Sequence, residues 1–253
     1  MTAHKEWFKA YTADIRKKVS DSVIEMVDLK IAHTFRVKNH SIKIAEGIGL
    51  NEKETNLAGL IGLYHDLGRF SQAIDFATMN DRITGSHADM SVDVFINHAP
   101  KDGLTKEDIQ VITKALEYHN LLTIPETDDY TALSAKLIRD ADKLDILDIF
   151  SNWEENQKFL YLSDKNDPCT KELLDFVLSG KNFNSNLVKN KNDCRLLYIS
   201  MIFDLNFTPS FKWLWNNDIL AKLTEVETDK PNEDMKKVFD YVSNWINNKM
   251  LSY

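Results

Sequence analysis

His65 and Asp66 stand side by side at the end of a helical segment that is apolar on every side, Leu57-Ala-Gly-Leu-Ile-Gly-Leu-Tyr64. Such a segment must be buried, and polar side chains stranded there without partners carry a large free-energy cost. A metal ion is one efficient partner, because imidazole nitrogen and carboxylate oxygen suit Zn, Mn, Fe, Co or Ni. A capping pair at a helix end is the other interpretation, and the dipeptide alone is compatible with both.

Two further histidines are expected to face the interior. His33 lies four residues from both Leu29 and Val37, and His119 follows Ile112 at helical spacing, so each shares an apolar helix face. A lone histidine on such a face is more often a hydrogen-bonded core residue than a metal ligand. Neither residue therefore indicates a metal site by itself.

Asp142 also falls on an apolar helix face, together with Ala135 and Ile138. An ionised carboxylate in that position needs a cation or several hydrogen-bond donors. Asp140 and Asp145 are close by and add repulsion, which either a bound metal or neighbouring lysines and arginines would relieve. The cluster is thus a candidate for metal binding, with a charged surface as the alternative.

The elements that must position these side chains are predicted to be helices. Only 8 Gly and 5 Pro punctuate the 253 residues, and apolar positions recur with helical spacing. Ser86 is expected to cap the helix in whose first turn His87 lies, where a neutral imidazole would be a natural ligand. Other caps are predicted where Asn51 precedes Glu54 and Thr105 precedes Asp108. Helices are expected near residues 3–20, 23–48, 52–66, 87–98, 106–119, 131–150, 151–162, 170–179, 191–204 and 233–250, with shorter turns in 209–224 and a loop over 68–85.

Composition limits the partners of the protein. Hydrophobic residues make up 43% and charged residues 28%, as in ordinary globular proteins. The net charge of -8 argues against binding to polymeric nucleic acid. No run of about 18 apolar residues occurs, so no membrane segment is expected and a cytoplasmic location is predicted. Cys169 and Cys194 are too few for a disulfide framework and are interpreted as reduced packing residues.

The order of the candidate residues along the chain carries more information than any one of them. It resembles the HD-domain superfamily of metal-dependent phosphohydrolases, in which helices bring a histidine, a His-Asp doublet and a late aspartate around a divalent metal. The resemblance covers roughly residues 23–150 and extends to His33-Thr-Phe-Arg-Val37, His65-Asp-Leu-Gly-Arg69 and Asp140-Ala-Asp-Lys-Leu-Asp145. It implies an all-α HD-type bundle over residues 1–150, with additional carboxy-terminal helices in 151–253 packed on it as one body.

The resemblance also implies a ligand set of one or two divalent transition-metal ions. His33, His65, Asp66 and Asp142 would bind the first ion; Asp66 would bridge to a second, held by His87 and His119. Asn120 stands where some two-metal members carry another histidine, and no Gly-Tyr-Pro motif follows it. Gly68 and Arg69 stand where the nucleotidase branch carries a glutamate, so the substrates of these branches are not carried over.

The function implied is hydrolysis of a small phosphate ester or nucleotide by a metal-activated water. Asp66 would orient that water or accept its proton, and Arg69 would contact a phosphate oxygen through a forked interaction. Lys143 is a further candidate for the phosphate contact. Two alternatives use the same scaffold: a di-iron oxygenase of the HD type, and a non-catalytic module that binds metal or nucleotide.

Overall fold

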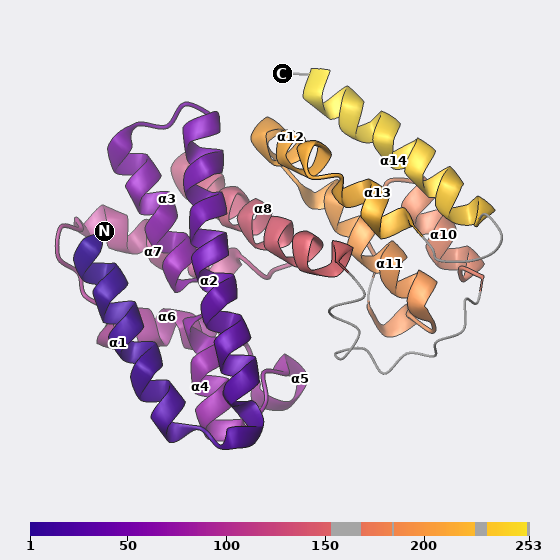
Figure 1. Ribbon diagram of the computed structural model, residues 1–253. Coiled ribbons are helices and arrows are strands. Elements are labelled where there is room, and N and C mark those ends of the chain that lie inside the picture. The colour runs from indigo at the N-terminus through magenta and orange to yellow at the C-terminus, as the bar shows by residue number, and fades with distance from the viewer. Residues whose placement is uncertain (153–167, 184, 226–231, 252–253) are drawn as a thin grey trace. The chain divides into compact units, whose positions relative to one another are not determined.

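The computed structural model describes residues 1–152, 168–183, 185–225 and 232–251, and every regular element within these ranges is a helix (Figure 1). The predicted all-α fold class is confirmed. The helices of the amino-terminal part are α1 (Thr2–Lys18), α2 (Asp21–Gly47), α3 (Glu52–Tyr64), α4 (Leu67–Phe76), α5 (Asp81–Thr84), α6 (His87–His98), α7 (Lys106–Tyr118) and α8 (Asp129–Ser151). Those of the carboxy-terminal part are α10 (Lys171–Leu178), η2 (Ser185–Leu187), α11 (Lys191–Ser200), η3 (Met201–Asp204), α12 (Thr208–Asn216), α13 (Ile219–Thr224) and α14 (Glu233–Leu251).

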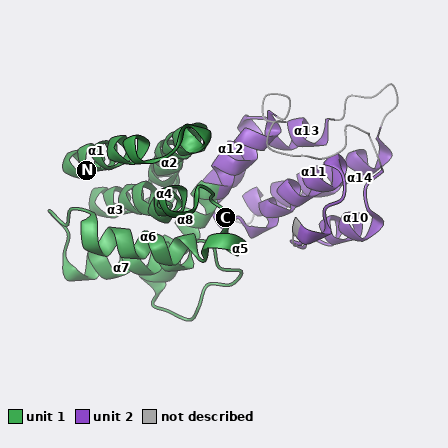
Figure 2. Ribbon diagram, turned by 90° about the horizontal axis from the view of Figure 1, so that it is seen from below, with its two compact units in different colours: residues 1–142 green, residues 143–253 purple. Residues whose placement is uncertain are grey.

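The chain divides into two compact units, residues 1–142 and 143–253, with the division inside α8 (Figure 2). All six predicted metal ligands belong to the first unit. The predicted boundary near residue 150 and the packing of both parts as one body stay predictions. No helix among the described residues has the length and apolar character needed to cross a bilayer.

Side-chain caps fix the starts of three helices that lead to the site. The predicted capping boxes are present at α3 and α7, where Asn51 pairs with Glu54 and Thr105 with Asp108. At α6 the Ser86 side chain accepts the backbone N–H of Asp89. These bonds satisfy amide groups that a first helical turn leaves free. They place His87 in the first turn of α6, as predicted.

Two glycines allow close approach of the helices that carry the site. A Cβ on Gly62 of α3 would lie 2.8 Å from the Lys38 Cα of α2. A Cβ on Gly68 of α4 would lie 2.1 Å from the His87 carbonyl oxygen of α6. Backbone contacts this short leave no room for any side chain, so α3 packs directly on α2 and α4 directly on α6. Gly68 therefore provides space for α6 within a continuous helix.

The segment 68–85 is largely helical, which corrects the prediction of a loop. Leu67, Phe70 and Ala73 recur at a spacing of three and are buried, so α4 has an apolar face despite Gly68. Its end is marked by Ala77, whose φ of 52° lies in the left-handed region. The short turns predicted in 209–224 are the helices α12 and α13. Most of the helix predicted over 151–162 lies outside the described residues.

Candidate metal centre

His65 and His119 occupy the carboxy-terminal caps of α3 and α7 and are held in the same way. Their Nδ1 atoms lie 2.9 Å from the Gly62 carbonyl oxygen and 2.7 Å from the Leu116 carbonyl oxygen, respectively. A carbonyl oxygen only accepts hydrogen bonds, so Nδ1 carries the proton in each ring. Both Nε2 atoms are therefore left with a lone pair, and both rings are buried.

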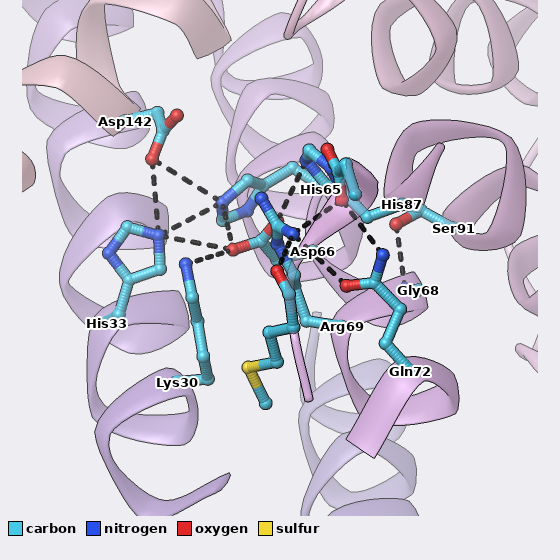
Figure 3. A network of polar contacts seen from close by, with 12 residues as sticks. Lys30, His33, His65, Asp66, Gly68, Arg69, Gln72, His87, Ser91 and Asp142 are labelled. Carbon is cyan, nitrogen blue, oxygen red and sulfur yellow. Dashed lines mark hydrogen bonds and ion pairs between the residues drawn. The ribbon is translucent and has the colours of Figure 1, made fainter. Parts of the chain in front are cut away.

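His33, from the middle of α2, faces His65 across the interface between α2 and α3 (Figure 3). Its Nε2 lies 3.3 Å from His65 Nε2, 3.4 Å from Asp66 Oδ2 and 3.2 Å from Asp142 Oδ1. His33, His65 and Asp66 can each offer a ligand atom to one ion; we call them the first ligand group. Asp142 extends this group from α8, with Oδ1 3.8 Å from His65 Nε2.

Asp66 lies between the first ligand group and a second one. Its Oδ2 faces His33 and His65, whereas its Oδ1 is 3.5 Å from His87 Nε2. His87 Nε2 is in turn 3.0 Å from His119 Nε2. Asp66, His87 and His119 form the second ligand group. A single carboxylate thus offers one oxygen to each group, which is the arrangement needed to bridge two ions.

The donor set fits a cation better than it fits a set of hydrogen bonds. Nδ1 of His65, His87 and His119 is directed at an oxygen that accepts, so the Nε2 atoms meet as lone pairs. Lone pairs 3.0 Å apart, as between His87 and His119, repel unless a positive charge lies between them. Imidazole nitrogen and carboxylate oxygen in this arrangement are suited to divalent transition metals.

Comparison with known protein families gives a match between residues 31–147 and the HD domain. Residues 31–147 form an HD domain. The match spans all six predicted ligands, from His33 to Asp142. Comparisons with curated proteins and with solved structures gave no match.

The electrostatics of the HD domain favour the deprotonated forms of five predicted ligands, His65, Asp66, His87, His119 and Asp142. Burial lowers the pKa of His65 and of His87, and it lowers the pKa of His119 to about 4. Burial alone would raise the pKa of Asp66, but the positive charge of Lys30 outweighs it and holds that pKa below its usual value. Burial likewise opposes the ionisation of Asp142, and its hydrogen bond with His33 lowers its pKa on balance. Metal binding requires these deprotonated forms.

Lys30 is a residue of the site that the sequence did not single out. Its Nζ lies 2.7 Å from Asp66 Oδ2, and its side chain is 28% exposed. It is one helical turn before His33 on α2, a spacing that puts both on one helix face. The spacing of three residues from the predicted ligand His33 is the sequence signal that could have identified Lys30 as a residue of the site. Lys30 brings a partly accessible positive charge to the edge of the HD domain's ligand cluster.

The two basic residues predicted to contact phosphate are engaged within the protein. Arg69 Nη1 donates to Asp81 Oδ1 at 2.7 Å and to the Met79 carbonyl oxygen at 2.6 Å, while its Nε lies 3.7 Å from Asp66 Oδ1. Lys143 Nζ lies 2.7 Å from Asp204 Oδ2, within the carboxy-terminal unit. The phosphate contacts assigned to Arg69 and Lys143 stay predictions.

Proposed function

We propose that this protein is a metal-dependent phosphohydrolase that acts on a small phosphate ester or nucleotide. The observation that carries the proposal is the convergence of four imidazole Nε2 atoms and two carboxylates, with three Nδ1 atoms already directed at oxygen acceptors. The match of residues 31–147 to the HD domain supports the same conclusion, since metal-dependent hydrolysis is common among proteins with that domain.

The residues present would hold up to two divalent ions. His33, His65 and Asp142 would bind one, His87 and His119 the other, and Asp66 both. When bound, such an ion lowers the pKa of a water molecule toward about 7 and neutralises charge on phosphoryl oxygens. Mn, Fe, Co, Ni and Zn all suit these ligands.

The surrounding side chains would bind and orient an anionic substrate. Lys30 has its ammonium group next to Asp66 and retains exposure to solvent, so it is placed to attract a phosphate group. Asp66, held in its ionised form, is the group placed to orient the attacking water. Arg69 lies on the other side of Asp66 and adds positive charge to the same region.

The test is metal analysis of the purified protein together with hydrolysis assays. We expect bound transition metal, and turnover of nucleotides or simple phosphate esters in the presence of Mn, Co, Ni, Zn or Mg. His65→Ala should lose both metal and activity, because His65 belongs to the first ligand group. His98→Ala is the matched control: His98 is exposed at the end of α6 and should be dispensable.

Three results would contradict the proposal. Full metal content and activity in His65→Ala would show that the ligand assignment is wrong. Bound iron with an electronic absorption or spin signal, and oxidation of an organic substrate without phosphate release, would favour the oxygenase. Metal binding without turnover on any substrate would favour a regulatory module.

A further inference from the structure

Asp81, the first residue of α5, contacts a predicted metal ligand through one oxygen and two donors through the other. Its Oδ2 lies 2.6 Å from His87 Nδ1. Its Oδ1 accepts from Arg69 Nη1 at 2.7 Å and from Gln72 Nε2 at 2.8 Å. Arg69 and Gln72 both extend from α4 into the network that contains His87 (Figure 3). The carboxylate is therefore fixed from one side and presents its free oxygen to His87.

His87 differs in this respect from His65 and His119. Those two rings are anchored by a carbonyl oxygen of their own helix, three residues earlier, so the anchor exists whenever the helix forms. His87 lies in the first turn of α6 and has no preceding helical turn to supply such a carbonyl. Its anchor must come from another segment, and Asp81 of α5 provides it.

We propose that Asp81 is a positioning residue for His87, and that it makes occupancy of the second ligand group depend on α5. This inference rests on the proposed metal site. An ionised carboxylate can only accept a hydrogen bond, so Asp81 fixes the proton of His87 on Nδ1 and leaves Nε2 free as a ligand. The negative charge also makes the ring a stronger electron donor. The side-chain bonds of Asp81 go to Arg69, Gln72 and His87, and none of these three residues belongs to the first ligand group, which should therefore depend less on α5.

The position of α5 itself depends on the same contacts. A helix of four residues is not stable alone. Gln72, buried on α4, reaches both ends of α5, bonding to Asp81 Oδ1 and to Thr84 Oγ1 at 2.5 Å. Arg69 acts through the same carboxylate. Arg69 thus also holds Asp81, which connects α4, α5 and the second ligand group.

The decisive variants are Asp81→Asn and Asp81→Ala. In Asp81→Asn the amide oxygen is drawn to the two donors, Arg69 and Gln72, so the amide N–H groups face His87 Nδ1. That nitrogen must then accept, the proton moves to Nε2, and the ligand lone pair is lost. Asp81→Ala removes the anchor and the contacts to Arg69 and Gln72, but it presents no donor to His87 Nδ1, so that nitrogen can keep its proton and Nε2 its lone pair. We therefore expect the second ion to bind about 10–100-fold more weakly in Asp81→Asn than in the wild type. The loss of affinity in Asp81→Ala should be smaller, and the affinity of the first ion should be unchanged in both variants.

Two measurements test whether Asp81→Asn weakens the second ion more than Asp81→Ala does. Titration with Mn or Zn, followed by calorimetry, gives the affinity of each ion. Nitrogen NMR of the metal-free protein gives the His87 tautomer directly, with the proton on Nδ1 in the wild type and on Nε2 in Asp81→Asn. Asp89→Asn is the matched control, because it removes one charge two residues from His87 on the exposed side of α6 and should change neither quantity.

The results separate this inference from the proposed function. If the wild type binds no transition metal, the proposed function fails, and the tautomer alone decides whether Asp81 positions His87. An unchanged tautomer in Asp81→Asn overturns the inference. So does an Asp81→Asn protein that binds both ions like the wild type, or one that is less impaired than Asp81→Ala, since loss of mere structural support would make alanine the more damaging change.

Discussion

Replacing Gly68 by alanine would put a methyl group into the contact between α4 and α6. The new Cβ would lie 2.1 Å from the His87 carbonyl oxygen and 2.8 Å from the Ser91 backbone nitrogen. Ordinary contact begins near 3.4 Å, so α6 must retreat by about 1.3 Å (3.4 − 2.1 Å). The hydrogen bond from Gly68 N–H to Ser91 Oγ, now 2.8 Å, would be broken or stretched. Since the obstacle is backbone, no side-chain rotation can relieve it.

The expected cost follows from these numbers. Overpacking costs about 1–3 kcal/mol, and the clash with backbone places Gly68→Ala at the upper end. Alanine regains about 0.5–1 kcal/mol of helix propensity, which leaves a net loss of about 2 kcal/mol. For a chain of this size that loss lowers Tm by about 4–8 °C. Because α6 carries His87, the second ion should be lost before the first.

Gly59→Ala in α3 is the matched control for the helix-propensity gain. Its Cβ would meet only side-chain atoms, Ile42 Cγ1 at 3.0 Å and Met1 Cε at 3.2 Å, which can shift. Urea denaturation should show Gly59→Ala close to the wild type and Gly68→Ala clearly less stable. Equal stability of the two variants, or a Gly68→Ala protein that retains both ions, would refute the argument from close approach.

Three further predictions follow from the charges of the site. The pKa of His119 is lowered from 6.5 to about 4, so the stability that depends on its neutral form is complete above pH 6.5 and is lost as pH falls toward 4. Over that range the free energy of unfolding of the metal-free protein should fall by about 3 kcal/mol more than that of His119→Gln. The same dependence of unfolding free energy on pH in both proteins would contradict this. Lys30→Met leaves Asp66 without its cation and should destabilise the metal-free protein by about 3 kcal/mol. Saturating Zn should abolish this loss of stability. A loss that persists with metal bound would show that Lys30 does not act by neutralising Asp66. Arg69→Ala should weaken the second ion in metal titrations because it releases Asp81, whereas a rise in KM alone would support the predicted phosphate contact.

The sequence predicted the helical fold class and the stretches that hold the ligands, but not the contacts between them. The pattern around His33 and the apolar run before His65 showed burial, and the caps at Asn51 and Thr105 showed where helices begin. Partners distant in sequence were not visible. The pairing of Lys30 with Asp66 spans 36 residues and depends on how α2 and α3 pack. The position of α4 was missed because the segment 68–85 was interpreted as a loop.

Asp81 was missed for a related reason. It lay in a segment interpreted as a loop, where an aspartate is common in turns and gives no signal. The carboxylates that the sequence did single out, Asp140 and Asp145, flank the predicted ligand Asp142. A carboxylate that supports a histidine must match the direction of its Nδ1–H, and that direction is set by the tertiary arrangement of α5 and α6.

The places of the histidines on their helices make the two ligand groups electrostatically unequal. His65 and His119 lie at carboxy-terminal helix ends, where free carbonyl groups create a partial negative charge that favours a cation. His87 lies at the amino-terminal end of α6, where the partial charge is positive and disfavours one. The second ligand group must offset this with the charges of Asp66 and Asp81. The first group has Asp66 and Asp142, and the amino-terminal end of α4, which begins directly after Asp66, is common to both groups. The affinity of the second ion should consequently be the more sensitive of the two to loss of a nearby carboxylate.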